Sequence, residues 1–324
     1  MRRINRRQGT LVALALAGVA ALMAWLAHPA GAGPADNSPV ARYNGNISVY
    51  GVCRGVDPSC YHDWNTPFKK NQTPRALVYT ATGVSRHAHL GPLLKPGMNP
   101  PLTAANAAQN AMIRWGNEFG FRVDWTEDVN EITTARLRNY NTVIFLSNSR
   151  TILDDAAQTA LMQYVRSGGG FVAIHNTLGA MYHWPWFQGL LGGANFYDHG
   201  AHRDGEVEVL NTRDVSTSTL PKRFDFKDEW YNLEPFPSFV NFLAAADEST
   251  MPGGATGSNG HPGHGDFHPV SWCQYYDGGR SWVTSLGHDV AAWNDDPLTG
   301  KEYFKEHVVN GILSTMGVKP FCQK

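Results

Sequence analysis

The chain has 324 residues, of which 42% are hydrophobic and 17% are charged, and this composition excludes a wholly disordered or collagen-like protein. Its 27 lysines and arginines nearly balance 28 aspartates and glutamates, giving a formal net charge of −1. This balance argues against nucleic acid or an anionic membrane surface as the main partner, because both require a basic face.

The first 32 residues have the features of a secretory signal peptide. Four arginines within residues 2–7 precede an apolar run over residues 11–27, and small residues follow at 30–32. We expect cleavage after Ala32, which leaves 23 lysines and arginines against 28 acidic residues. After cleavage we expect no membrane partner. An uncleaved N-terminal anchor is the alternative, because the apolar run is near the short limit for a membrane span.

The four cysteines of the chain are Cys53, Cys60, Cys273 and Cys322. An even number behind a secretory leader favours disulfides, and four cysteines allow three pairings. Because Cys53 and Cys60 enclose a short polar loop, we expect a local bridge there and a second bridge from Cys273 to Cys322. Free buried thiols are the alternative. A cysteine-ligated metal is not expected, since the chain has no CxxC spacing.

Strand-like and helical patterns alternate in the first half of the chain, after an irregular extension that we expect at residues 33–74. The patterns predict a strand at 75–80, a loop at 81–101, a helix at 103–119, a strand at 121–125, a helix at 133–139, a strand at 142–146, a helix at 154–167 and a strand at 171–174. Strands and helices joined by short connections predict an α/β fold with a mainly parallel sheet.

The pattern changes after residue 175, although we expect the same domain to continue to residue 318 and a short tail to follow at 319–324. The second half predicts a short helix at 184–191, a strand with one exposed face at 206–210, a hairpin of strands at 270–275 and 281–286, and a closing helix at 303–316. Residues 250–266 are rich in Gly, Pro, Ser and His and predict a long loop near the mouth of a site, with His261 and His264 in solvent.

One stretch stands out because it carries a histidine out of a buried strand. Three glycines at 168–170 predict the end of a helix, since glycine enters the left-handed region without steric cost. Residues 171–174 are apolar without alternation, which predicts a strand buried on both faces. His175 would then lie at the carboxyl end of a strand, where open α/β sheets bind ligands. The alternative is a buried histidine bonded only to the backbone.

Other histidines also fall at the ends of predicted elements, where binding groups are usually placed. They are His87, His89, His199, His268 and His288. Asp228 and Glu229 form a pair of carboxylates next to two aromatic residues. Histidine and carboxylate together suit proton transfer near neutral pH, or a metal site with nitrogen and oxygen ligands.

Six motifs in this order resemble the ThuA-like (trehalose utilisation) family. They are GGGFVAIH at 168–175, WFQGLLGGANF at 186–196, DEWY at 228–231, HPVSW at 268–272, GGR at 278–280 and SLGH at 285–288. The resemblance covers about residues 75–318. It implies a flavodoxin-like, class I glutamine amidotransferase-like fold with a mainly parallel sheet and helices on both faces. It also implies a link to the catabolism of sugars, particularly 3-keto derivatives of glucosides and of disaccharides such as trehalose.

The resemblance also carries an exclusion. In glutamine amidotransferases of this fold, the elbow between strand and helix carries a cysteine nucleophile, whereas this chain has His175 there and no cysteine nearby in sequence. Glutamine hydrolysis through a thiolate is therefore not expected. Two loops depart from the family pattern: the His-Ala-His-Leu loop after the first strand and the long loop at 250–266. The identity of the sugar substrate is therefore left open.

These patterns together predict a secreted or periplasmic enzyme that acts on a keto derivative of a glycoside. Proton abstraction beside a carbonyl would give isomerisation or elimination, with His175, Glu229 or Asp228 as the base. The expected substrate-binding residues are His87, Asn176, His199, Trp230, His268 and His288.

The cofactor is left open by the sequence, with a divalent metal as one alternative. The candidate ligands for such a metal are His87, His175, His199 and His288. The expected partner is a small-molecule or oligosaccharide substrate. A non-catalytic carbohydrate-binding protein and a metal-dependent hydrolase are the alternative functions.

Overall fold

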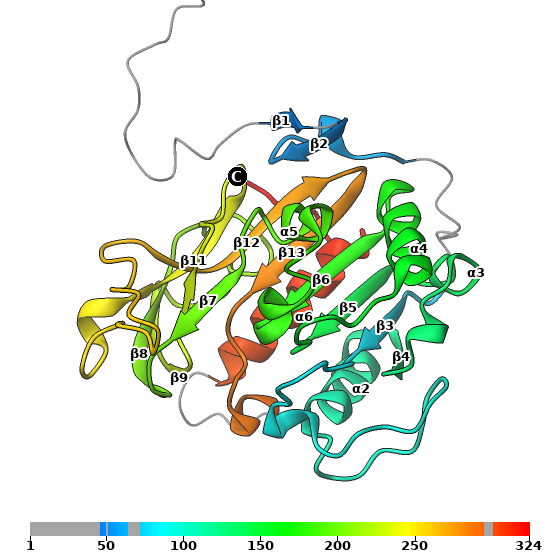
Figure 1. Cartoon of the computed structure of the whole chain (residues 1–324). Coiled ribbons are helices and arrows are strands. Elements are labelled where there is room, and N and C mark those ends of the chain that lie inside the picture. The colour runs from blue at the N-terminus through cyan, green and yellow to red at the C-terminus, as the bar shows by residue number, and fades with distance from the viewer. Residues whose placement is uncertain (1–45, 50, 64–71, 295–300) are drawn as a thin grey trace, which may run out of the picture. The chain divides into compact units, whose positions relative to one another are not determined.

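An eleven-stranded sheet organises the computed structural model, which describes residues 46–49, 51–63, 72–294 and 301–324 (Figure 1). The predicted signal peptide at 1–32 lies outside the described residues. The strands are β1 (Asn46–Val49), β2 (Val52–Gly55), β3 (Arg75–Tyr79), β4 (Arg122–Thr126), β5 (Thr142–Leu146), β6 (Gly170–Ile174), β7 (Phe196–His199), β8 (Arg203–Val209), β9 (Arg223–Asp228), β10 (Tyr231–Leu233), β11 (Asn241–Asp247), β12 (His268–Tyr276) and β13 (Gly279–Thr284). The α-helices are α2 (Ala107–Phe119), α3 (Thr134–Leu137), α4 (Asp155–Arg166), α5 (Pro185–Leu190) and α6 (Lys301–Thr315).

Half of the large sheet is parallel. The strand order begins β4-β3-β5-β6-β13, and every neighbouring pair in this run is parallel. All residues of β5 and β6 are buried, as the unbroken apolar run at 171–174 predicts for a central strand. The predicted flavodoxin-like α/β fold with a parallel sheet is therefore confirmed.

The other half of the sheet is antiparallel and continues β13 through β12, β11, β8 and β9. Burial alternates along β8 and β9, as expected for strands with one face in solvent. Strand β2 also pairs with β12, so part of the predicted irregular extension joins the main sheet as a hairpin with β1. The separate strands β7 and β10 pair with each other.

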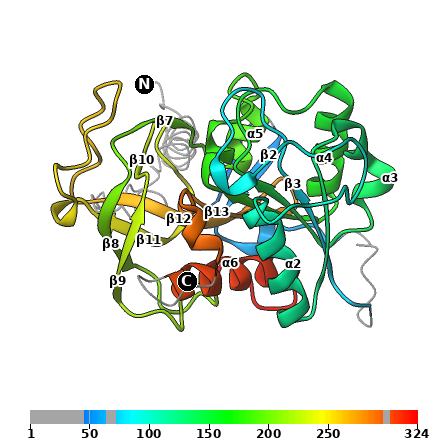
Figure 2. The ribbon, with the colours of Figure 1, turned by 90° about the horizontal axis from the view of Figure 1, so that it is seen from below.

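Helices cover both faces of the parallel half, as predicted (Figure 2). Successive side chains of β3 point to opposite faces of the sheet. Ala76 and Val78 therefore pack with α2 and α6 on one face, whereas Leu77 and Tyr79 pack with α3, α4 and α5 on the other. Both sets of side chains are fully buried. Among the described residues, no helix is long and apolar enough to cross a membrane.

Most predicted elements lie within a few residues of the observed ones, and the largest shift among them is at the start of α2. Strands β7, β9, β10 and β11 are not among the predicted elements. The sequence predicts Thr103 as its N-cap, but the helix begins at Ala107. The side chain of Asn106 accepts the backbone N–H of Thr103 (2.9 Å) and donates to the carbonyl of Leu90 (2.7 Å), which keeps residues 103–106 in a turn. By contrast, α4 begins within one residue of its predicted start, because Asp154 is its N-cap and accepts from the backbone N–H of Ala157 at 2.8 Å.

Both predicted disulfides, Cys53–Cys60 and Cys273–Cys322, are present. The first closes a loop with a sequence separation of 7, and the second closes one of 49 and ties the C-terminus to β12. Because a cross-link stabilises mainly by restricting the unfolded chain, the longer loop has the larger effect.

Removal of the two disulfides should therefore cost different amounts of stability. The chain-entropy model gives a loss of about 4 kcal/mol for Cys273→Ala with Cys322→Ala, and about 2 kcal/mol for Cys53→Ala with Cys60→Ala. The free energy of unfolding in urea measures both losses. Equal losses from the two double variants would contradict this explanation.

His307 on α6 predicts a dependence of stability on pH. Its ring is buried between the carbonyl of Ser216 (2.8 Å) and the hydroxyl of Ser271 (2.9 Å), and burial lowers its pKa to about 4. Because the unfolded state has a histidine pKa near 6.5, it binds the proton first, and the free energy of unfolding should fall as the pH drops from about 6.5 to 4, by up to about 3 kcal/mol from this group.

Urea unfolding at several pH values, compared with His307→Gln, measures this contribution. The variant should show a shallower decrease over the same pH range, whereas His183→Gln, at an exposed histidine, should retain the full decrease. Parallel pH profiles for His307→Gln and the wild type would rule out His307 as the cause.

Candidate active site

Four side chains from four separate chain segments meet at the carboxyl edge of the parallel strands. His87 follows β3, His175 directly follows β6, and His288 follows β13 by four residues. These strands are parallel, so their carboxyl ends lie at the same edge of the sheet. Glu229 reaches this edge from the short connection between β9 and β10.

The ligand-type atoms of these four residues all lie within 4.8 Å of one another. The Nε2 atoms of His87 and His175 are 3.2 Å apart, and Glu229 Oε2 lies 2.9 Å from Nδ1 of His288. Glu229 Oε2 is also 3.8 Å from His175 Nε2 and 3.9 Å from His87 Nε2. We call His87, His175, His288 and Glu229 the histidine–glutamate cluster.

His175 occupies the elbow position that the sequence predicts. Its φ of +53° is unusual for a residue other than glycine, and this sharp turn separates β6 from the 3₁₀ helix His175–Gly179. A similar strained turn presents the nucleophile in α/β hydrolases. The register of β6 against β13 places Ser285 beside it, and His175 Nδ1 donates to the Ser285 carbonyl at 2.7 Å. Its Nε2 atom therefore carries a lone pair directed into the cluster.

The buried carboxylate of Asp228 holds two members of the cluster in place. It accepts the backbone N–H groups of Gly287 (2.7 Å) and His288 (3.1 Å), and also that of Glu229 (2.8 Å). Asp228 is fully buried, and its burial raises its pKa to about 7. The predicted role of Asp228 as a base does not fit this position, because its oxygens face backbone amides. Asp228 is instead a positioning residue.

His89 braces the same region from the loop after β3. Its Nδ1 lies 2.8 Å from the His288 carbonyl and its Nε2 lies 2.8 Å from the hydroxyl of Ser147, at the end of β5. Burial lowers the pKa of His89 to about 3, so the ring is neutral near pH 7. His89 therefore connects the segments that carry His87 and His288.

Tyr231 belongs to the site, although the sequence does not predict its contact with His175. Its hydroxyl lies 2.9 Å from His175 Nε2, and its ring stacks on His175 with a centroid distance of 4.6 Å. The pairing of β10 with β7 places it opposite His199. The signal in the sequence is only its position two residues after Glu229, which the aromatic context of DEWY obscures.

Electrostatics divide the cluster into a neutral and a charged part. Burial lowers the pKa of His175 well below its usual value, and the neighbouring His87 adds to this effect. Burial acts to raise the pKa of Glu229, but hydrogen bonds from His288 and His87 outweigh it and hold the pKa below the usual range. Burial acts to lower the pKa of His288, but its bond to Glu229 raises it above the usual value. Near pH 7, Glu229 is thus an anion beside a histidine that favours its charged form.

The cluster is accessible from solvent at one side. The side chains of His87 and Glu229 retain 10% and 14% of their exposure, that of His288 retains 28%, and His175 is fully buried. His199 lies at this rim, with Nε2 3.6 Å from Glu229 Oε2 and 31% of its side chain exposed. Solvent therefore reaches the cluster, which contains groups for proton transfer and for the polarisation of an oxygen atom. The same four atoms could also hold a divalent metal.

His202 is a rim residue that the sequence does not indicate. Its ring centroid lies 4.9 Å from that of His288, and its Nε2 lies 3.6 Å from Asp289. His202 does not end a predicted strand, so no pattern in the sequence marks its contact with His288.

Two predicted substrate-binding residues lie elsewhere. Trp230 is buried in the core, where its indole N–H donates to the carbonyl of Arg203 at 3.2 Å, so its face is not available to stack on a sugar. His268 is fully buried, and its two nitrogens contact Glu248 (2.6 Å) and the Tyr231 carbonyl (3.0 Å). Both predictions are corrected by this packing, because each residue is held by structural hydrogen bonds.

Asn176 and His264 are also packed into the structure. Asn176 is only 6% exposed, and its amide lies against Gly179. His264 is not in solvent as predicted: it accepts the backbone N–H of Leu233 at 2.9 Å, and burial lowers its pKa to about 3. The loop at 250–266 is therefore fastened to β10 by a side chain that composition alone assigns to solvent.

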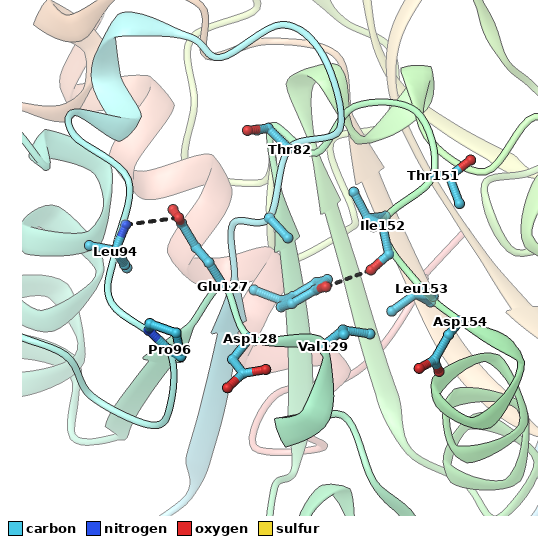
Figure 3. A pocket seen from close by; sticks show the side chains of 12 residues that line it. Thr82, Leu94, Pro96, Glu127, Asp128, Val129, Thr151, Ile152, Leu153 and Asp154 are labelled. Atoms are coloured by element: carbon cyan, nitrogen blue, oxygen red, sulfur yellow. Dashed lines mark hydrogen bonds between the residues drawn. The ribbon is translucent and has the colours of Figure 1, made fainter.

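A separate cavity of about 520 Å³ lies beyond the ends of β3, β4 and β5 (Figure 3). Its lining contains no member of the cluster. Its acidic residues are already engaged in local hydrogen bonds: Glu127 accepts from Leu94 at 3.0 Å, Asp128 from Gly97 at 3.0 Å, and Asp154 from Ala157. These bonds stabilise the surrounding loops, and we assign no chemistry to this cavity.

Substitution of Asp228 should destabilise the fold more than that of an exposed aspartate on the same strand. Asp228→Asn replaces one acceptor oxygen by an N–H₂ group, so at least one buried backbone N–H loses its partner, at a cost of about 1–3 kcal/mol. Asp225→Asn, at an exposed position of β9, should change the free energy of unfolding by less than about 0.5 kcal/mol. Urea denaturation of the two variants measures the difference, and equal effects would be inconsistent with the positioning role.

Comparison with known proteins identifies the family to which this chain is similar. A family model described as trehalose utilisation (ThuA) matches residues 99–313. Among solved structures, a ThuA-like protein of Bacteroides uniformis has a TM-score of 0.56 at 24% identity, covering 76% of this chain and 93% of its own. A ThuA-like protein of Parabacteroides merdae has a TM-score of 0.55 at 16% identity, covering 78% of this chain and 93% of its own. Curated proteins give no match.

At these identities the structural similarities establish the fold alone. The family model, however, covers more than half of the chain and includes all six motifs. The chain therefore belongs to the trehalose utilisation (ThuA) family, which implies a role in carbohydrate metabolism.

Proposed function

We propose that this protein is an exported enzyme that removes a proton beside the carbonyl group of a keto-glycoside. The observation that carries the proposal is the histidine–glutamate cluster, in which four proton-transferring or oxygen-polarising groups meet at the carboxyl edge of the sheet. Membership of a carbohydrate-utilisation family supports a sugar as the substrate.

The proposed reaction starts with a sugar whose C3 hydroxyl has been oxidised to a ketone. A base takes the proton from C2, and the electron pair of that C–H bond forms a C2–C3 double bond while the ketone oxygen becomes an enolate. For isomerisation, the C2 hydroxyl loses its proton and becomes a ketone, the electron pair of the C2–C3 double bond takes a proton at C3, and the C3 oxygen is protonated to a hydroxyl. For elimination, the C3 ketone forms again, the electron pair of the C2–C3 double bond forms a C1–C2 double bond, the bond from C1 to the glycosidic oxygen breaks, and that oxygen takes a proton as the alcohol leaves.

The charge distribution of the cluster suits the two tasks of this reaction. His175 is neutral, with its Nε2 lone pair directed into the cluster, and Glu229 is ionised, so either can accept the proton. His288, in its charged form, and the hydroxyl of Tyr231 can donate hydrogen bonds to the developing enolate oxygen. Because both bases have lowered pKa values, strong stabilisation of the enolate is essential.

Export is supported by two features of the chain. The first 32 residues have the pattern of a signal peptide. The two disulfides are typical of an oxidising compartment such as the periplasm or the cell exterior. A keto-sugar generated outside the cytoplasm would be the accessible substrate.

A second candidate function is carbohydrate binding without catalysis, and a different region favours it. A cavity of about 490 Å³ is lined by aromatic side chains, including Trp186, Phe239 and Tyr276, together with Arg54 and Arg166. Aromatic faces beside polar groups suit sugar rings. Retention of unmodified glycans without product formation, unaffected by substitutions in the cluster, would favour this function.

His175→Ala should abolish turnover and leave the fold in place. Loss of a general base typically reduces the rate by 10²- to 10⁴-fold, and we expect a decrease of about 10³-fold with 3-keto-glucosides or 3-keto-trehalose. Product formation followed by NMR measures the rate, and circular dichroism checks the fold.

His183→Ala is the matched control, because this exposed histidine lies in the next segment outside the cluster. It should retain wild-type turnover. Turnover by His175→Ala at the wild-type rate would remove His175 from the mechanism and this function with it.

A further inference from the structure

We propose that the histidine–glutamate cluster binds one divalent transition-metal ion through His87 Nε2, His175 Nε2, His288 Nδ1 and Glu229 Oε2. The role of this ion in catalysis rests on the proposed function, but its binding does not. The argument depends on the spacing of these four atoms, on the groups behind them, and on the hydrogen bonds that they can form without a metal.

The spacing fits a four-coordinate cation. Ligands at 2.0–2.2 Å from a tetrahedral metal are about 3.3–3.5 Å from one another. Four of the six separations in the cluster are 2.9 Å (Glu229–His288), 3.2 Å (His87–His175), 3.8 Å (Glu229–His175) and 3.9 Å (Glu229–His87), which bracket this value. The other two separations are at most 4.8 Å, so side-chain movements of up to about 1 Å would bring all four atoms to ligand distance.

The groups behind the ligands already have the arrangement of a second coordination shell. His175 donates its Nδ1 proton to the Ser285 carbonyl, which leaves Nε2 free for a metal. The backbone of Glu229 and that of His288 are both fixed by Asp228, and the His288 carbonyl contacts His89. The ligand-bearing segments are therefore held in position before any ion binds, which lowers the entropic cost of binding.

Without a metal, two contacts within the cluster compete for the same atom of His175. His175 Nε2 has one lone pair in the ring plane, yet it is approached both by the Tyr231 hydroxyl at 2.9 Å and by His87 Nε2 at 3.2 Å. Both contacts cannot be good hydrogen bonds to the same lone pair. A cation at the centre would accept the lone pairs of all three imidazoles at once, and the hydroxyl proton of Tyr231 could rotate toward a substrate oxygen.

The donor set selects the class of metal. Three imidazoles and one carboxylate suit Zn²⁺ and the neighbouring divalent ions Mn²⁺, Fe²⁺, Co²⁺ and Ni²⁺. Mg²⁺ and Ca²⁺ prefer oxygen ligands, of which the cluster offers one. Both cysteine pairs are in disulfides, so thiolate ligands are absent from the described residues.

A metal in this position sharpens the proposed reaction. With the ketone oxygen as a fifth ligand, the ion would polarise this oxygen and stabilise the enolate, which meets the need created by the weak bases of the cluster. Glu229 and His175 would then be ligands, and the proton acceptor would be His199 at the rim. His199 Nδ1 contacts the Gly200 carbonyl at 2.6 Å, so Nε2, 3.6 Å from Glu229 Oε2, carries the free lone pair.

Metal titration of the full-length protein tests the site without reference to any sugar. Protein treated with a chelator and then freed of it should bind one Zn²⁺ per chain by calorimetry, and should bind Co²⁺ with the visible absorption bands of a four-coordinate site. His87→Ala and His288→Ala should each weaken Zn²⁺ binding by about 100-fold or more, and His183→Ala should not. Glu229→Gln, which retains the shape of the side chain, guards against a fold defect in the alanine variants, and its affinity should fall as well.

Absence of stoichiometric Zn²⁺, Mn²⁺ or Co²⁺ binding by the wild type would overturn the proposal, as would unchanged affinity in folded His87→Ala and His288→Ala proteins. Turnover of keto-sugars by metal-free protein would refute the catalytic role of the metal but leave the proposed function intact. Tight metal binding without keto-sugar turnover would support the site and refute the proposed function.

Discussion

The buried carboxylate of Asp228 is the contact on which the site depends. It joins the connection after β9 to the connection after β13 by accepting backbone N–H groups from both. These three hydrogen bonds offset part of the cost of burying the carboxylate. Without Asp228, no carboxylate would fix the backbones of Glu229 and His288 relative to each other. The 2.9 Å contact between their side chains would then be less well ordered.

The sheet explains why the remaining ligands meet there. Parallel strands β3, β6 and β13 end at the same edge, so His87, His175 and His288 are delivered together, although the chain separates them by up to 201 positions. The antiparallel half of the sheet supplies the carboxylates, because its strand β9 ends at Asp228 and Glu229 follows directly. The parallel half thus provides the histidines, and the antiparallel half provides the acidic residues.

The core and the elbow could be predicted from sequence because their signals are local. The apolar run at 171–174 and the glycines before it each have one structural interpretation. His175 follows from these by position. The histidines at the ends of β3 and β13 were marked by the same reasoning, and the structure brings them to His175.

The errors concern residues whose environment is set by distant parts of the chain. Trp230 lies next to Glu229 in sequence, but the side chains at 229 and 230 point in different directions, and Trp230 enters the core. His268 is taken by Glu248 and by the Tyr231 carbonyl, contacts that no local pattern reveals. Tyr231 was obscured for the same reason, since its contact with His175 depends on how β10 pairs with β7.

The central claim is that this cluster removes a proton from carbon beside a ketone, and isotope exchange tests it most directly. A 3-keto-glucoside incubated in D₂O with the protein should lose its C2–H signal in the proton NMR spectrum, whether or not the glycosidic bond is later broken. The exchange should stop in His175→Ala, since the cluster is then incomplete. The account would be contradicted if the wild-type protein binds the keto-sugar but the C2–H signal is lost no faster than in the uncatalysed control.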